Sequence, residues 1–212
     1  MIATVPGFVK WIFKNRIWEG PADEKAIYLT FDDGPIPEVT PWVLDQLKSF
    51  NAKATFFCIG ENVQKHPEIF KKIIAEGHKV GNHTFNHLNG WKTSTPEYVL
   101  NTLKARQIIE KNIPGKEPAK NALFRPPYGR IKSKQVRELQ KRDFRIIMWS
   151  ILSMDYNTGI TPERCFQNVI DHARPGSVIV FHDSFKAQKN LVKVLPRVLD
   201  HLNREGYKFK AL

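Results

Sequence analysis

The chain of 212 residues has an ordinary globular composition, with 42% hydrophobic and 25% charged residues, and is long enough for one domain with a buried core. Its formal net charge of +12 favours an anionic partner: an acidic glycan, an anionic lipid surface or a nucleic acid. Two widely separated cysteines exclude a disulfide framework, and the absence of a zinc-finger motif, an RNP-like motif or a dense basic run argues against nucleic acid.

Residues 1–25 form a basic and aromatic segment ahead of the predicted domain, which is residues 26–212. Three basic residues interrupt its apolar runs: Lys10, Lys14 and Arg16. No small-residue cleavage site follows, so we predict neither a signal peptide nor a membrane span, and we expect a cytoplasmic protein.

The same segment is expected to pack against the domain. The alternative is an interfacial helix that would hold the protein peripherally on an anionic membrane surface. Such a helix would turn four apolar side chains toward the lipid: Phe8, Trp11, Ile12 and Trp18.

Strand-like apolar runs alternate with helix-like segments through the rest of the chain. The predicted strands are residues 26–31, 54–59, 79–82, 122–124, 144–149, 177–181 and 207–211. Helices are predicted after the capping pairs Thr40-Pro41, Thr95-Pro96 and Thr161-Pro162, from Ser133, and over residues 190–205, where Pro196 should introduce a kink. This alternation predicts a parallel sheet, either open and doubly wound or closed into a small, incomplete β/α barrel.

Polar motifs follow the predicted strands. They are Asp32-Asp33, HTFNH (residues 83–87), RPPYG (residues 125–129), Asp155 and His182-Asp183. Because the carboxyl ends of parallel strands meet at one rim, and α/β sheets and barrels build their sites there, we expect these residues to lie together.

The paired aspartates and paired histidines indicate metal chemistry. His83 and His87 are spaced i and i+4, which puts two imidazoles on one side of a helical turn and suits a zinc-like ion. An aspartate from another strand end would complete a ligand set that leaves positions open for water and substrate. One of Asp32 and Asp33 could then bind the metal while the other acts as a base, and the cation would relieve their mutual repulsion.

Four motifs in order, TFDDG, HTFNH, RPPYG and VFH, resemble those of the polysaccharide deacetylases, the NodB-homology domain of carbohydrate esterase family four. The resemblance runs from about Ala26 to the C-terminus. It implies an α/β fold, a distorted and incomplete (β/α) barrel of about seven strands. It also implies hydrolysis of the acetamide of an N-acetylated amino sugar in a glycan, an oligosaccharide or a cell-wall fragment.

The resemblance also assigns residues to roles. It makes Asp33, His83 and His87 the ligands of one divalent metal ion, which we expect to be zinc, with cobalt or nickel as alternatives. It makes Asp32 the general base and His182 the general acid. The remaining roles are supporting ones: Arg125 orients Asp32, the Tyr128 N–H helps to hold the oxyanion, and Asp155 favours the His182 imidazolium.

One motif departs from the family. Where the family has D-x-x-D-W, this chain has LSMDY, so that Leu152 replaces the first aspartate and Tyr156 the tryptophan, while Asp155 is kept. Substrate preferences therefore transfer poorly. Two alternatives stay open: a deacylase or deformylase of a membrane-linked amino sugar, and a catalytically idle glycan-binding protein.

Overall fold

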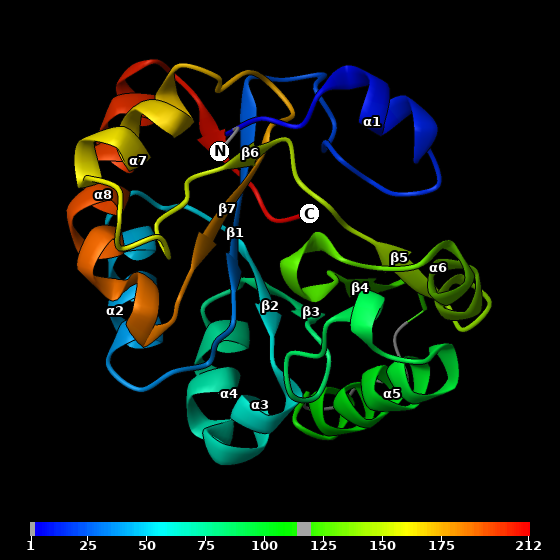
Figure 1. Cartoon of the computed structure of the whole chain (residues 1–212). Coiled ribbons are helices and arrows are strands. Elements are labelled where there is room, and N and C mark those ends of the chain that lie inside the picture. The colour runs from blue at the N-terminus through cyan, green and yellow to red at the C-terminus, as the bar shows by residue number, and fades with distance from the viewer. Residues whose placement is uncertain (1–2, 114–119) are drawn as a thin grey trace.

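A computed structural model describes residues 3–113 and 120–212 and shows a curled sheet with helices on its outer side (Figure 1). The strands are β1 (Ala26–Asp32), β2 (Thr55–Cys58), β3 (Lys79–Asn82), β4 (Ala122–Phe124), β5 (Phe144–Ile146), β6 (Ile151–Leu152), β7 (Val178–His182) and β8 (Lys208–Phe209). Their order is β5-β4-β3-β2-β1-β7-β6, every pair along this path is parallel, and β8 pairs with β1. The predicted incomplete barrel is confirmed.

The helices are α1 (Gly7–Ile12), α2 (Val39–Ser49), α3 (Gly60–Lys65), α4 (Pro67–Ala75), α5 (Thr95–Lys111), α6 (Ser133–Gln140), α7 (Pro162–Ile170) and α8 (Phe185–Arg204), with 3₁₀ turns η1 (Gly90–Lys92) and η2 (Pro127–Gly129). Helix α8 starts earlier than predicted and continues past Pro196. Within the described residues, no helix combines the length and the apolar character that crossing a membrane requires.

The central strand β1 shows why a parallel sheet forms here. All seven of its residues are buried, which fits an apolar run covered on both faces by neighbouring elements. Phe31 stacks on Phe56 of β2 and on Phe181 of β7, with ring centroids 5.1 and 6.0 Å apart. The strand that carries Asp32 at its end is therefore fixed on both sides.

The prediction of one strand over residues 144–149 is wrong in part. Only residues 144–146 form a strand, β5, which pairs with β4 at one edge of the sheet. The next strand, β6, begins at Ile151 and pairs with β7 at the other edge. The chain thus crosses the open side of the barrel, where Ile17 forms a parallel bridge with Ile147 and its carbonyl accepts the Met148 N–H at 2.7 Å. Residues from the N-terminal segment fill the gap that a single strand cannot span.

Two of the predicted helix starts also differ from the structure. Helix α2 begins at Val39, and the Thr40 hydroxyl bonds outside the helix. Helix α5 is capped by Ser94, whose Oγ accepts the Glu97 N–H at 3.4 Å, one residue before the predicted cap. Thr161 caps α7 as predicted, accepting the Arg164 N–H at 3.2 Å.

The N-terminal segment packs on the barrel through Trp18, while α1 contributes the half-buried Val9 and leaves its large apolar side chains exposed. Trp18 is 9% exposed, lies in the core cluster that also includes Phe124 and Phe144, and donates its indole N–H to the Phe13 carbonyl at 3.2 Å. The α1 side chains Phe8, Trp11 and Ile12 are instead 66%, 79% and 56% exposed. Three of the four side chains considered for a lipid-facing helix are therefore open to solvent, and the fourth is in the core.

Candidate active site

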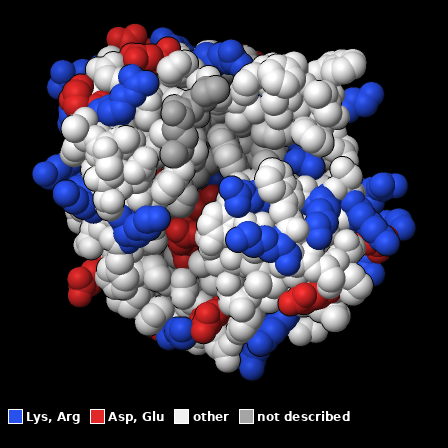
Figure 2. All heavy atoms as spheres, in the orientation of Figure 1, with Lys and Arg blue, Asp and Glu red and all other residues white. Residues whose placement is uncertain are grey.

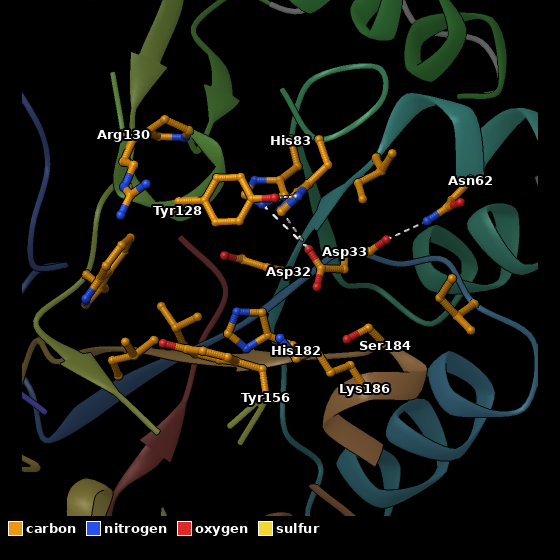
Figure 3. A pocket seen from close by; sticks show the side chains of 18 of the residues that line it. Asp32, Asp33, Asn62, His83, Tyr128, Arg130, Tyr156, His182, Ser184 and Lys186 are labelled. Carbon is orange, nitrogen blue, oxygen red and sulfur yellow. Dashed lines mark hydrogen bonds and ion pairs between the residues drawn. The ribbon is translucent and has the colours of Figure 1, made fainter. Parts of the chain in front are cut away.

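Six predicted site residues line one cleft of about 790 Å³ at the carboxyl ends of the strands: Asp32, Asp33, His83, His87, Tyr128 and His182. The other two, Arg125 and Asp155, are fully buried and contact Asp32 and His182. Asp32 ends β1, His83 follows β3, and His182 ends β7, directly opposite Asp32 in the strand register. Figure 2 shows acidic side chains inside a hollow in the middle of this face, with lysines and arginines around it. Figure 3 shows Asp32 between His83 and His182. The expectation that the strand-end motifs lie together is confirmed.

Asp33, His83 and His87 form a cluster that could hold a metal ion, since one ligand atom from each lies within 4.8 Å of the others. The Oδ1 atom of Asp33 is 3.3 Å from His87 Nε2 and 3.8 Å from His83 Nε2. Among the described residues it is one of the few buried polar atoms without a hydrogen-bond partner. A cation would satisfy this oxygen, so the residues fit a bound metal.

Both histidines present the same nitrogen to this cluster because the other one is already engaged. His83 Nδ1 lies 2.8 Å from the Arg125 carbonyl, which can only accept, and His87 Nδ1 lies 3.0 Å from the Tyr128 hydroxyl. With the proton on Nδ1, each Nε2 carries the lone pair that a metal needs. Burial lowers the pKa of His83 to about 4 and also lowers the pKa of His87, so both rings are neutral, as metal ligands must be.

A turn rather than a helix brings the two histidines together. Thr84 and His87 have left-handed backbone angles, with φ of 65° and 60°, and the Thr84 hydroxyl accepts the Leu88 N–H at 3.1 Å. The ring centroids of His83 and His87 are 5.1 Å apart. Asp33, Tyr128 and Met154 also have positive φ values, of 88°, 59° and 64°. Strained backbone therefore gathers around the cleft.

Arg125 holds Asp32 in a buried ion pair. The Arg125 NH1 group lies 2.8 Å from Asp32 Oδ1 and 2.6 Å from Thr30 Oγ1, and NH2 donates to the Met148 carbonyl at 2.8 Å. Both partners are buried, and the guanidinium lies 4.1 Å from the centroid of the Phe57 ring. Burial alone would raise the pKa of Asp32, but the Arg125 charge and the nearby histidines outweigh it and hold the pKa below its usual value. Asp32 is thus a carboxylate at neutral pH.

Asp155 holds His182 from the opposite side. Its Oδ1 lies 2.8 Å from His182 Nδ1, and its Oδ2 accepts the His182 backbone N–H at 2.8 Å. Burial would lower the pKa of His182, but the charge of Asp155 and its hydrogen bond outweigh burial and raise the pKa to about 9. His182 is therefore an imidazolium at neutral pH, with Nε2 available to donate.

The remaining motif residues form the walls of the cleft. Tyr128 is 60% exposed at the edge of the cleft. Leu152 and Tyr156, the two departures from the family motif, both line it, and the Tyr156 ring packs edge-on against His182 with centroids 4.8 Å apart. The altered motif thus changes the wall beside His182.

Three contacts to the site were not anticipated from the sequence. The Asn62 amide donates to the Asp33 carbonyl at 2.7 Å, the Ser153 hydroxyl donates to Asp155 Oδ1 at 3.1 Å, and the Asp183 carboxylate accepts the Gly34 N–H at 3.0 Å. Nothing in the sequence marks Asn62 or Ser153. Asp183 had one signal, its place next to His182 at a strand end.

Comparisons with known proteins agree with this geometry. Residues 19–147 match the family model described as polysaccharide deacetylase. The chain is 37% identical over 204 residues to a peptidoglycan-N-acetylglucosamine deacetylase of Bacillus cereus, a match covering 95% of this chain and 72% of the relative.

Two solved structures extend the comparison to the fold. The Bc1960 peptidoglycan N-acetylglucosamine deacetylase has a TM-score of 0.87 and 35% identity, covering 98% of this chain and 95% of that one. The pseudoenzyme BA3943 of Bacillus anthracis has a TM-score of 0.81 and 26% identity, covering 93% of this chain and 67% of that one.

Proposed function

Because the chain belongs to the polysaccharide deacetylase family, we propose that it is a metal-dependent N-deacetylase of an N-acetylated amino sugar in a glycan, an oligosaccharide or a cell-wall fragment. The relatives make peptidoglycan the first glycan to test. The observation that carries the proposal is the Asp33 oxygen, buried without a hydrogen-bond partner and facing two histidine nitrogens.

In this proposal Asp33, His83 and His87 hold one divalent metal ion. The two nitrogens and one carboxylate oxygen suit zinc, with cobalt or nickel as alternatives. When bound, the ion would polarise the acetyl carbonyl and acidify the attacking water.

The chain's own residues move the protons. Asp32, ionised and fixed by Arg125, takes a proton from the water as it attacks the acetyl carbon. The Tyr128 N–H donates to the oxyanion that develops on the carbonyl oxygen. His182 is protonated and gives a proton to the departing amine nitrogen, which leaves poorly as an anion.

The test is release of acetate. We expect purified, zinc-loaded protein to release acetate from N-acetylated glycans, and Asp32→Asn to lose on the order of a hundredfold or more in kcat while keeping its metal. His83→Ala and Asp33→Ala should lose zinc on dialysis against a weak chelator. Zinc retained by both variants would contradict the metal site.

The match to a pseudoenzyme makes an idle glycan-binding protein the contrasting outcome. The presence of base, acid and metal-ligand candidates in one cleft supports turnover instead. Binding of glycans without release of an acyl group from any of them would show that the protein is a catalytically idle glycan-binding protein.

A second candidate function is a deacylase or deformylase of a membrane-linked amino sugar, favoured by the exposed Phe8, Trp11 and Ile12 of α1. The apolar face and the net charge of +12 suit an anionic lipid surface. Co-sedimentation with phosphatidylglycerol-rich vesicles, abolished by Trp11→Glu but not by Trp91→Glu, and formate release from a lipid-linked substrate would support it. Trp91 is a matched control because it is 59% exposed and lies outside α1.

A further inference from the structure

Asp183 has a fully buried carboxyl group that takes no part in the proposed chemistry. Its Oδ1 accepts the Gly34 N–H at 3.0 Å and its Oδ2 accepts the Thr40 hydroxyl at 2.6 Å. The Thr40 oxygen itself accepts the Ile36 N–H at 2.8 Å, so its hydrogen is free to go to Asp183. The backbone N–H of Asp183 also donates to the Asp32 carbonyl at 3.0 Å. Asp183 is therefore bonded to both ends of the turn that follows β1.

This turn contains the strained backbone of Asp33. A φ of 88° is unfavourable for a residue other than glycine and persists only where the surroundings hold it. A side-chain carbon on Gly34 would collide with the Asp183 carboxylate, so the close approach of Asp183 requires glycine after the aspartate pair. The motif DDG (residues 32–34) and the motif HD (residues 182–183) are therefore in direct contact.

The strand register sets where this contact acts. Asp32 and His182 are opposite each other in the parallel pair of β1 and β7. Just past these strand ends, the Asp183 side chain accepts the N–H of Gly34, the residue that follows Asp33. The bond therefore lies between the proposed metal ligand and the proposed general acid.

We propose that Asp183 is a positioning residue, which holds Gly34 and Thr40 so that Asp33 keeps the left-handed conformation that aims its carboxylate at His83 and His87. This inference rests on the proposed function, because it takes Asp33 to be a metal ligand. It assigns to Asp183 no contact with substrate.

Zinc affinity tests the proposal, measured with zinc alone by competition against a chromophoric chelator. Asp183→Ala should weaken zinc binding about 10–100-fold, the loss typical of residues that orient metal ligands, and lower kcat with it. Asp183→Asn keeps an oxygen for the Gly34 N–H and an amide that can donate to Thr40, so it should stay within about threefold of the native affinity. Native zinc affinity in folded Asp183→Ala would overturn the proposal.

His78→Ala separates positioning from general destabilisation. His78 is buried at the opposite rim, where its Nδ1 accepts the Ala54 N–H at 3.2 Å. This variant should lower Tm and leave zinc affinity unchanged. If His78→Ala weakens zinc binding as much as Asp183→Ala does, the effect is one of stability and the proposal fails.

Two further variants keep the outcomes distinct. If Asp183→Ala does not fold, Thr40→Val preserves shape and removes only the hydroxyl, and native zinc affinity in that variant would overturn the proposal. If Asp33→Ala binds zinc normally, the proposed function itself fails. If Asp33→Ala loses zinc while Asp183→Ala does not, the inference about Asp183 fails alone.

Discussion

His182 and Asp32 carry opposite charges at neutral pH because each is paired with a buried partner of the other sign. Asp155 raises the pKa of His182 to about 9 against the effect of burial, and Arg125 holds the pKa of Asp32 low against the same effect. His182 is therefore protonated and Asp32 deprotonated before the substrate binds, which is the arrangement that general acid–base catalysis needs.

Asp155→Asn should move the alkaline limb of the kcat/KM profile to lower pH. With the pKa of His182 at about 9, native activity should decline as pH rises through that value. Loss of the neighbouring carboxylate removes the main effect that raises this pKa, so the limb should fall toward the ordinary histidine range. The profile of His182→Ala is the control, because ionisation of water at the metal gives a limb of its own. An unmoved limb in folded, zinc-loaded Asp155→Asn would show that Asp155 does not tune His182.

The pairing of Asp155 with His182 should also change how the free energy of unfolding depends on pH. A histidine whose pKa rises on folding stabilises the protein fully below its unfolded pKa and loses that contribution as pH rises through the folded value. The native protein should therefore lose more stability than Asp155→Asn between about pH 6.5 and 9.

Arg125→Met should lower the free energy of unfolding by about 3–5 kcal/mol at pH 7, because it leaves the buried Asp32 carboxylate without its partner. The acid limb of kcat/KM should also rise in pH, since the Arg125 charge lowers the pKa of Asp32. The double variant Arg125→Met with Asp32→Asn should recover part of the loss in urea unfolding of the metal-free protein. A double variant no more stable than Arg125→Met would exclude the unpaired charge as the cause.

Sequence analysis found the charged residues of the site and missed the contacts that hold the turn at Asp33. Asp32, Arg125 and His182 each end or follow a strand, and the rim of a parallel sheet brings strand ends together. Asn62 and Asp183 contact the Asp33 turn across sequence distances of 29 and 149 residues. Such contacts depend on the exact placement of α3 and β7, which no local pattern specifies.

The Thr-Pro pattern predicted the helix cap correctly at Thr161 but not at Thr40 or Thr95. Thr161 caps α7, but the Thr40 hydroxyl, in the same Thr-Pro pattern, bonds Asp183 and leaves α2 to begin at Val39. Likewise, residues 144–149 have the composition of one strand, yet β5 ends at Ile146 and the chain crosses to the other edge of the sheet, where β6 pairs with β7. Tertiary contacts override local signals in both cases.

Thr161→Ala should lower the free energy of unfolding by about 1 kcal/mol, because the Arg164 N–H loses its acceptor at the start of α7. Ser94→Ala should cost less, since the Ser94 hydroxyl lies 3.4 Å from the Glu97 nitrogen, against 3.2 Å at Thr161. Urea unfolding of the two variants checks the order, and the reverse order would contradict the cap assignment.

The open side of the barrel is covered by the N-terminal segment, which the sequence shows only to be basic and aromatic. Bridges join Thr4, Ile17 and Glu19 to Ile151, Ile147 and Ser177, so the N-terminal segment contacts the strands around the open side of the barrel. Sequence patterns could predict a barrel with an opening but not which segment closes it, because closure is made by isolated bridges and one buried indole rather than by a strand.

Substitution by alanine should lower the free energy of unfolding strongly at one tryptophan of this segment and hardly at all at another. Trp18→Ala should lower the free energy of unfolding by about 3–5 kcal/mol, the range for a large aromatic removed from a core, because Trp18 is buried in the core cluster with Phe124 and Phe144. Trp11→Ala should stay within about 0.5 kcal/mol of the native value, since Trp11 is 79% exposed. Equal losses in urea unfolding would show that α1 is packed more tightly than the structure describes.

The left-handed backbone around the cleft also limits how this protein can diversify. Met154 has a φ of 64° and is buried beside Asp155, in the motif that departs from the family. Glycine and asparagine tolerate that conformation best, whereas valine and isoleucine are excluded by their branched side chains. A library randomised at position 154 and selected for folded protein should therefore be enriched in glycine and asparagine. New substrate preferences should arise more readily at Leu152 and Tyr156, which line the cleft with ordinary backbone angles.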